Sequence, residues 1–243
     1  MKNKIFKYLS LFILIIICTF IVSHEYFKTT ISISNNYGMV VKNGSKEKKV
    51  IALTFDDGPH PKYTSEILDI LNEYDAKATF FVLGKFAEAY PDIIKRQWEE
   101  GHEIGNHTYS HINTKKVSKD KIQEEYIKTQ EVISSITNNN PKLFRPPYGS
   151  LDEKVIDVVE NNNSVIVLWS YNQDSKDWSN PEVNKIVNTT LSNIENGDII
   201  LFHDYVYYDE SHTVEALKKI IPELKNRGYE FVTISELINL TTD

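Results

Sequence analysis

The stretch VIALTFDDGP, residues 50–59, decides the fold, because an apolar run ends there in two carboxylates and a turn. Residues 50–55 are typical of a buried strand, and Gly58 and Pro59 are turn-forming residues. Adjacent side chains of an extended chain point to opposite sides. We therefore expect Asp56 and Asp57 to have different roles, one as a metal ligand and the other as a base. The alternative is a pair that only forms a turn or caps a helix.

The alternation of strand and helix continues along the chain. Further strands are predicted at 78–83, 103–106, 142–144, 165–170, 198–202 and 229–233, and helices at 64–74, 86–100, 119–137, 152–161, 181–195 and 213–226. Gly101, Gly197 and Gly228 follow three of these helices, where a residue with positive φ is common. Seven strands alternating with helices imply parallel strands joined by crossovers. We expect an α/β fold in which a single domain forms a closed or nearly closed barrel.

The N-terminus has the pattern of an export signal. Three lysines within residues 1–7 precede an apolar run at 8–22, so residues 1–23 are predicted to be a signal peptide or a membrane anchor. Small residues suited to cleavage are few after this run, which favours an uncleaved anchor in the cell membrane with the catalytic domain outside. Cleavage would instead leave a secreted or wall-associated protein.

The remaining organisation follows from composition. Residues 24–48 are rich in Ser, Asn, Lys and Gly and are predicted to be a tether, and residues 49–243 are predicted to be the folded domain. The only cysteine, Cys18, lies in the apolar segment, so no disulfide can stabilise the exported part. With 27 basic and 34 acidic residues, the chain has a net charge of −7. An acidic chain without a basic stripe is a poor nucleic-acid binder, so we expect no nucleic-acid partner.

Chemically suggestive residues cluster at or just after the ends of predicted strands, where α/β barrels have their active sites. Besides the aspartate pair, the clusters span 107–111, 145–148, 174–178 and 203–204. His107 and His111 have the i, i+4 spacing of one face of a helical turn, and one carboxylate would complete a two-His, one-Asp metal site. Surface helices also produce this spacing by chance. His203 is either a general acid or a hydrogen-bonded core histidine, and Arg145 either orients a carboxylate or forms a structural ion pair.

Five motifs in order resemble those of the polysaccharide deacetylase family, also called carbohydrate esterase family 4 or the NodB homology domain. They are TFDDGP at 54–59, HTYSH at 107–111, RPPY at 145–148, DSKDW at 174–178 and LFH at 201–203. The resemblance covers roughly residues 49–240. It implies a distorted (β/α) barrel of seven or eight parallel strands and a metal-dependent hydrolase that removes N-acetyl groups from a polysaccharide.

The resemblance also implies a role for each residue at the metal. Asp57, His107 and His111 would hold one divalent metal, usually zinc and sometimes cobalt. Asp56 would be the base that activates water, and Arg145 would orient it.

Other positions would act on the leaving group and the substrate. His203 would protonate the leaving nitrogen. Asp177 would hold His203, although Asp174 of the same motif is the alternative contact and otherwise faces the substrate. The backbone N–H of Tyr148 would stabilise the oxyanion. Leu201 would line the acetyl pocket and Trp178 would form an apolar wall.

We expect the substrate to be N-acetylglucosamine residues of peptidoglycan, because this is the acetylated polymer outside a bacterial cell. Chito-oligosaccharides, an N-acetylglucosamine exopolysaccharide and acetylated xylan remain alternatives within the family. A non-catalytic wall-binding domain and a hydrolase of small amides are the alternatives outside it. The expected partners are the glycan and, through residues 1–23, the membrane, and the expected state is a monomer.

Overall fold

A computed structural model describes residues 40–205, 208 and 210–242. The predicted membrane segment 1–23 and residues 24–39 of the predicted tether lie outside this part. Within the described ranges, no helix is both long enough and apolar enough to traverse a bilayer. The folded unit begins at Val40.

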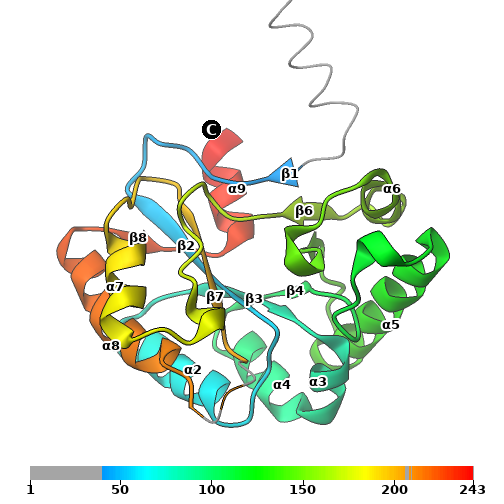
Figure 1. The fold of residues 1–243 in the computed structure, drawn as a ribbon, viewed down its shortest axis with the longest axis horizontal. Helices are drawn as coiled ribbons and strands as arrows, with labels where there is room; N and C mark the ends of the chain where they lie inside the picture. The colour runs from blue at the N-terminus through cyan, green and yellow to red at the C-terminus, as the bar shows by residue number, and fades with distance from the viewer. Residues whose placement is uncertain (1–39, 206–207, 209, 243) are drawn as a thin grey trace, which may run out of the picture. The chain divides into compact units, whose positions relative to one another are not determined.

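Eight strands of the described part form one curved, parallel sheet in the order β1-β6-β5-β4-β3-β2-β7, with β8 beside β2 (Figure 1). The strands are β1 (Val40–Val41), β2 (Val50–Asp56), β3 (Ala78–Val82), β4 (Glu103–Asn106), β5 (Leu143–Phe144), β6 (Val165–Val167), β7 (Ile199–His203) and β8 (Glu230–Phe231). All seven residues of β2 are buried, because both faces of a central parallel strand are covered. Each of the seven strands predicted from the sequence is present.

The sheet is brought close to a barrel by a loop instead of a further strand. After β6, residues 170–175 lie along the free edge of β7. The Ser170 N–H donates to the Ile199 carbonyl at 3.0 Å, the Leu201 N–H to the Gln173 carbonyl at 2.9 Å, and the Ser175 N–H to the Leu201 carbonyl at 3.2 Å. The fold is the distorted (β/α) barrel expected from the sequence. Its irregular part, which we call the seam, is the loop 170–175 between β6 and β7.

Helices cover the outside of this sheet (Figure 1). They are α2 (Tyr63–Glu73), α3 (Gly84–Ala89), α4 (Pro91–Glu99), α5 (Lys119–Thr137), α6 (Glu153–Asn161), α7 (Val183–Leu191), α8 (Thr213–Asn226) and α9 (Ile234–Thr242). The largest core cluster packs apolar residues of α2 and α8 against β2, β3 and β7, among them Ile67, Leu217 and Phe55. Gly101, Gly197 and Gly228 have φ values of 80°, 76° and 82°, as predicted.

Three features differ from the sequence expectations. The single helix predicted at 86–100 is two helices, because Pro91 removes a backbone donor and begins a new helix as its first residue. The C-terminal α9 was not predicted. Neither was β1, which lies inside the range assigned to the tether. It pairs with β6, with Val40 opposite Ile166. Two residues are too few to show a period in the sequence.

The strand register positions the site. In β2, Asp56 lies beside His203 of β7 on one side and beside Phe81 of β3 on the other. Asn106 of β4 lies beside Phe144 of β5, so Arg145 follows directly at the same edge. The motif residues that follow these strands therefore meet at the carboxyl ends of the sheet.

Candidate active site

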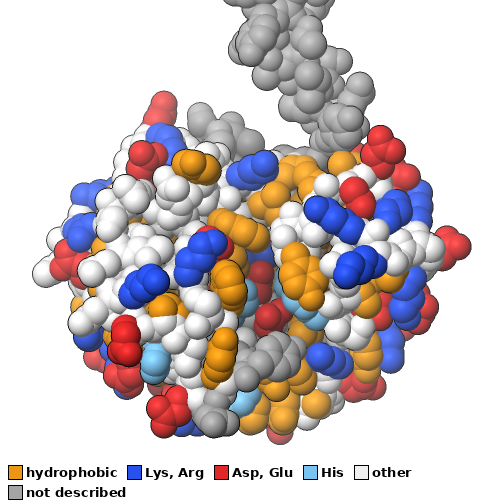
Figure 2. Space-filling model, in the orientation of Figure 1, with side chains coloured by type: hydrophobic (Ala, Val, Ile, Leu, Met, Phe, Trp, Pro, Cys, Tyr) orange, Lys and Arg blue, Asp and Glu red, His pale blue; other side chains and the backbone are white. Residues whose placement is uncertain are grey.

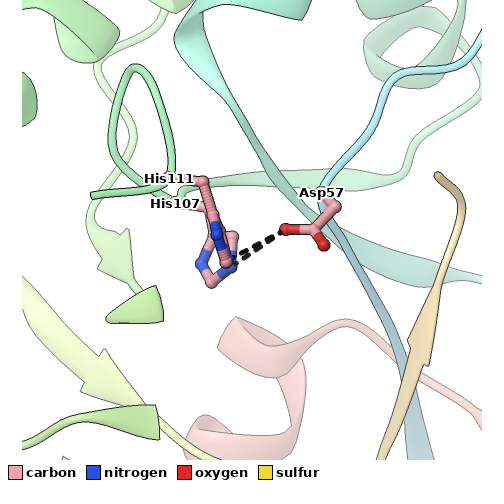
Figure 3. Close-up of side chains that lie close together, drawn as sticks. All are labelled: Asp57, His107 and His111. Carbon is pink, nitrogen blue, oxygen red and sulfur yellow. Dashed lines mark ion pairs between the residues drawn. The ribbon is translucent and has the colours of Figure 1, made fainter. Parts of the chain in front are cut away.

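Two imidazoles and one carboxylate face one another at this edge (Figure 3). The Nε2 atoms of His107 and His111 lie 3.5 Å and 3.3 Å from Oδ1 of Asp57. Burial raises the pKa of Asp57, but the imidazoles of His107, His203 and His111 outweigh burial and lower it to about 2. Asp57 is therefore a carboxylate over the whole physiological range.

The backbone that carries this cluster is not helical. The structure corrects the expectation of a helical turn at 107–111: these residues form a loop in which Thr108 and His111 have φ values of 69° and 61°. Asp57 also has a positive φ, 75°. This turn in the chain corrects a second expectation, because both Asp56 and Asp57 lie within 4 Å of His107 Nε2 instead of pointing apart. Non-glycine residues in this conformation store strain, and they gather at functional sites.

Contacts on the far side of the loop hold it in place. The Ser110 N–H and hydroxyl both donate to Glu125 of α5, which is buried. Tyr109 donates from its hydroxyl to Glu88 of α3, and its ring lies 3.5 Å from Lys128 Nζ. These contacts hold the segment between the two histidines in place.

The cluster suits a divalent cation. Oδ1 of Asp57 is buried and has no hydrogen-bond partner among the described residues, which is costly unless a ligand satisfies it. His107 Nδ1 lies 2.7 Å from the Arg145 carbonyl, and a proton on Nδ1 leaves Nε2 free to ligate. Two imidazole nitrogens and one carboxylate oxygen with open positions are a donor set typical of hydrolytic zinc sites.

Asp56 is held by a buried arginine. Arg145 is fully buried, and its Nη1 atom donates to Asp56 Oδ1 at 2.7 Å and to Thr54 Oγ1 at 2.8 Å. Its other nitrogens donate to the carbonyls of Val167 and Leu168. One oxygen of Asp56 is thus engaged, while Oδ2 faces His107 at 3.7 Å.

On the other side of the cavity, His203 pairs with Asp177. His203 Nδ1 lies 2.8 Å from Asp177 Oδ1, and Asp177 Oδ2 accepts from the His203 N–H and the Thr213 hydroxyl. Burial lowers the pKa of His203, but the carboxylates, Asp177 first and then Asp57 and Asp56, together outweigh burial and raise it to about 9. Of the two aspartates considered from the sequence, Asp177 makes this contact, whereas Asp174 pairs with Lys176.

These groups surround a cavity of about 730 Å³. Figure 2 shows it as a hollow with acidic and histidine side chains on its floor and hydrophobic side chains on its rim. The lining includes the substrate-facing residues predicted from the sequence: Tyr148, Asp174, Trp178 and Leu201. Tyr148 and Trp178 are exposed, and the Tyr148 ring meets His111 edge-on with centroids 4.7 Å apart.

Some supporting residues were not predicted. Trp169 lines the cavity, and its place near the end of the strand predicted at 165–170 was the available signal. Thr213 and Glu125 act through Asp177 and Ser110, and no sequence pattern reveals such distant partners. Asp204 directly follows His203 and was left without a role.

Asp204 is buried against the turn that carries Asp57. Its Oδ2 accepts from the Thr64 hydroxyl at 2.7 Å, while Oδ1 has no hydrogen-bond partner among the described residues. A Cβ at Gly58 would lie 2.1 Å from Asp204 Oδ2, so only glycine fits there. Burial raises the pKa of Asp204 to about 7.

The fold and this arrangement of acids, imidazoles and arginine define a hydrolase of the distorted-barrel type. Residues 43–167 match the polysaccharide deacetylase family. The chain is 43% identical over 201 residues to a peptidoglycan-N-acetylglucosamine deacetylase of Bacillus cereus, and the match covers 83% of this chain and 93% of that protein. The chain therefore belongs to the polysaccharide deacetylase family, and it is a polysaccharide deacetylase.

Solved structures agree with this assignment. A peptidoglycan N-acetylglucosamine deacetylase in complex with an N-hydroxybenzamide is 40% identical, with a TM-score of 0.80, and the match covers 86% of this chain and 96% of that chain. A family 4 acetyl xylan esterase of Clostridium thermocellum in complex with a cobalt ion is 38% identical, with a TM-score of 0.71, covering 79% of this chain and 91% of that chain.

Proposed function

We propose that this enzyme removes N-acetyl groups from N-acetylglucosamine residues of peptidoglycan, with one divalent cation, zinc or cobalt, held by Asp57, His107 and His111. One observation carries the proposal. The triangle of candidate ligands lies in one cavity with a carboxylate fixed by a buried arginine and an imidazole paired with a buried aspartate. When bound, the cation supplies Lewis acidity that polarises the acetyl carbonyl and makes water more acidic.

Asp56 is the general base. Its Oδ1 is occupied by Arg145 at 2.7 Å, so the carboxylate cannot rotate, and Oδ2 remains to take a proton from water. Arg145 is itself held by Thr54 and by two carbonyls, which makes it a positioning residue. In the same step Tyr148, whose φ of 61° turns the backbone at the cavity, presents its N–H to the developing oxyanion.

His203 is the general acid. An amine leaves an amide only with a proton, and the raised pKa of His203 keeps the imidazolium populated at neutral pH. Breaking the C–N bond then gives acetate and the free amino sugar. An ester needs less assistance because an alkoxide is a better leaving group. The His203–Asp177 pair therefore supplies the protonated group that an N-acetyl substrate requires.

Substrate binding uses the cavity rim. Leu201 lines the space for the acetyl methyl group, Trp178 forms the apolar wall, and Asp174 faces the sugar hydroxyls. The similarity to peptidoglycan deacetylases over almost their whole length supports peptidoglycan as the polymer. We further propose that residues 1–23 export the enzyme or anchor it at the membrane, where this polymer is accessible.

The test compares acetate release by the purified full chain from peptidoglycan, chitopentaose and acetylated xylan. We expect acetate release from peptidoglycan, and slower or no acetate release from xylan. Release from xylan alone would contradict the proposal in favour of an O-acetyl esterase. Glycan binding without any release would indicate a non-catalytic wall-binding domain.

A further inference from the structure

A second cavity, of about 950 Å³, continues from the active-site cavity. The two cavities share four lining residues: Tyr148, Gly149, Trp169 and Asp174. The remaining walls come from the end of β1, the loop 168–176 and α7. A polymer whose reacting sugar lies over the metal ligands can therefore extend into this second cavity, which we call the side groove.

The turn at 170–173 presents a large aromatic side chain to the side groove. The backbone of the turn is fixed, because the Ser170 hydroxyl donates to the Lys42 carbonyl at 2.9 Å and the Gln173 amide donates to the Asn193 carbonyl at 3.0 Å. Tyr171, at its tip, is 93% exposed. Folding does not bury this ring, so a rigid turn holds an aromatic face available for a ligand.

The side groove also carries a positive charge. Its two lysines differ, because Lys176 is paired with Asp174, whereas Lys42 is exposed and has no ion-pair partner among the described residues. The amide side chains of Asn172, Asn188 and Asn193 line the rest and suit hydroxyl groups. A net positive groove on a chain of net charge −7 is complementary to an anionic ligand.

We propose that the side groove binds the sugar next to the one being deacetylated, with its ring on Tyr171 and a carboxylate of its substituent near Lys42. The inference rests on peptidoglycan being the substrate. There, N-acetylglucosamine alternates with a sugar whose lactyl arm carries an anionic peptide, whereas every neighbour in chitin is neutral. The side groove thus distinguishes wall glycan from chitin through the neighbouring residue.

The test measures kcat/KM for acetate release by the full chain. The substrates are N-acetylglucosamine, its neutral chito-oligosaccharides up to the pentamer, and soluble peptidoglycan strands that carry peptides. Release from peptidoglycan by the unaltered protein establishes the proposed function independently of the side groove, and failure of release from peptidoglycan would contradict that function instead. The variants are Tyr171→Ala and Lys42→Glu. Lys48→Glu is the control, because Lys48 is also exposed but precedes β2 at the opposite end of the sheet.

Tyr171→Ala should lower kcat/KM roughly fivefold on the oligosaccharides and on peptidoglycan, as expected for one aromatic contact. It should hardly change kcat/KM on the N-acetylglucosamine monomer, which has no neighbouring sugar. Lys42→Glu should lower it on peptidoglycan alone, with a loss that shrinks at high salt. An unchanged length dependence in Tyr171→Ala would overturn the stacking contact. Equal losses on both substrates, or the same loss in Lys48→Glu, would overturn the charge recognition.

Discussion

Replacing Asp177 with Asn should move the alkaline limit of deacetylation to lower pH. His203 acts only while protonated. Burial alone lowers its pKa. Asp177 lies 2.8 Å from Nδ1 and is the largest of the influences that raise the pKa, which together bring it to about 9. Asn has nearly the same shape but no charge. In the variant, burial therefore still lowers the pKa of His203, while the main influence that raises it is lost.

The magnitude follows from the two pKa values. A rise from 6.5 to about 9 corresponds to roughly 3 kcal/mol in favour of the imidazolium. This stabilisation is complete below pH 6.5 and is lost as the pH rises toward 9. If the variant returns to its ordinary pKa, the protonated fraction near pH 8 falls roughly thirtyfold, whereas near pH 6 it changes by less than about twofold.

The assay is the pH profile of kcat/KM for acetate release, between about pH 6 and pH 10. Asp174→Asn is the matched control, because this carboxylate lines the same cavity but pairs with Lys176. Its alkaline limit should match that of the unaltered protein. A bound cation lowers the alkaline limit of activity in the unaltered protein and in both variants. The tested quantity is therefore the difference in this limit between the proteins. An Asp177→Asn variant that loses activity equally at every pH would show that Asp177 does not act by raising the pKa of His203.

Three further predictions concern the metal, the base and a buried acid. His107→Ala and His111→Ala should each lower bound metal and activity together, and unchanged metal content in both would contradict the ligand assignment. Asp56→Asn should abolish activity with metal retained, and should lower Tm because Arg145 is left buried and unpaired; near-normal rates would exclude Asp56 as the base. Because the pKa of Asp204 is raised to about 7, its ionisation destabilises the fold as the pH rises from 3.8. Asp204→Asn should therefore raise Tm near pH 8 but hardly near pH 4, and equal shifts at both would contradict this.

Much of the fold could be predicted because parallel strands are buried on both faces. The run at 50–56 is apolar except for Thr54 and its last residue for that reason, and the carboxyl ends of such strands meet at one edge. This is why Asp56 and His203, far apart in sequence, could be assigned to one site. The seam at 170–175 could not be predicted, because its backbone hydrogen bonds to β7 leave no period in the side chains.

Within the site, residue types were predictable but conformations were not. The i, i+4 spacing of His107 and His111 indicated a shared ligand, yet the loop achieves it with two left-handed residues that no helical periodicity describes. Likewise, the positive φ of Asp57 turns its carboxylate toward His107 together with that of Asp56. Contacts such as Thr213 with Asp177 depend on how α8 packs, and packing is decided by the whole chain.

Metal dependence is tested most sharply by titrating metal into the chelated full chain, with acetate release from peptidoglycan and bound metal measured together. No release is expected without metal. Release should then rise in proportion to bound zinc or cobalt and reach a plateau at one ion per chain, and His107→Ala should fail to follow this curve. Full release from metal-free protein, or a plateau unrelated to binding at Asp57, His107 and His111, would show that these residues do not hold a catalytic metal.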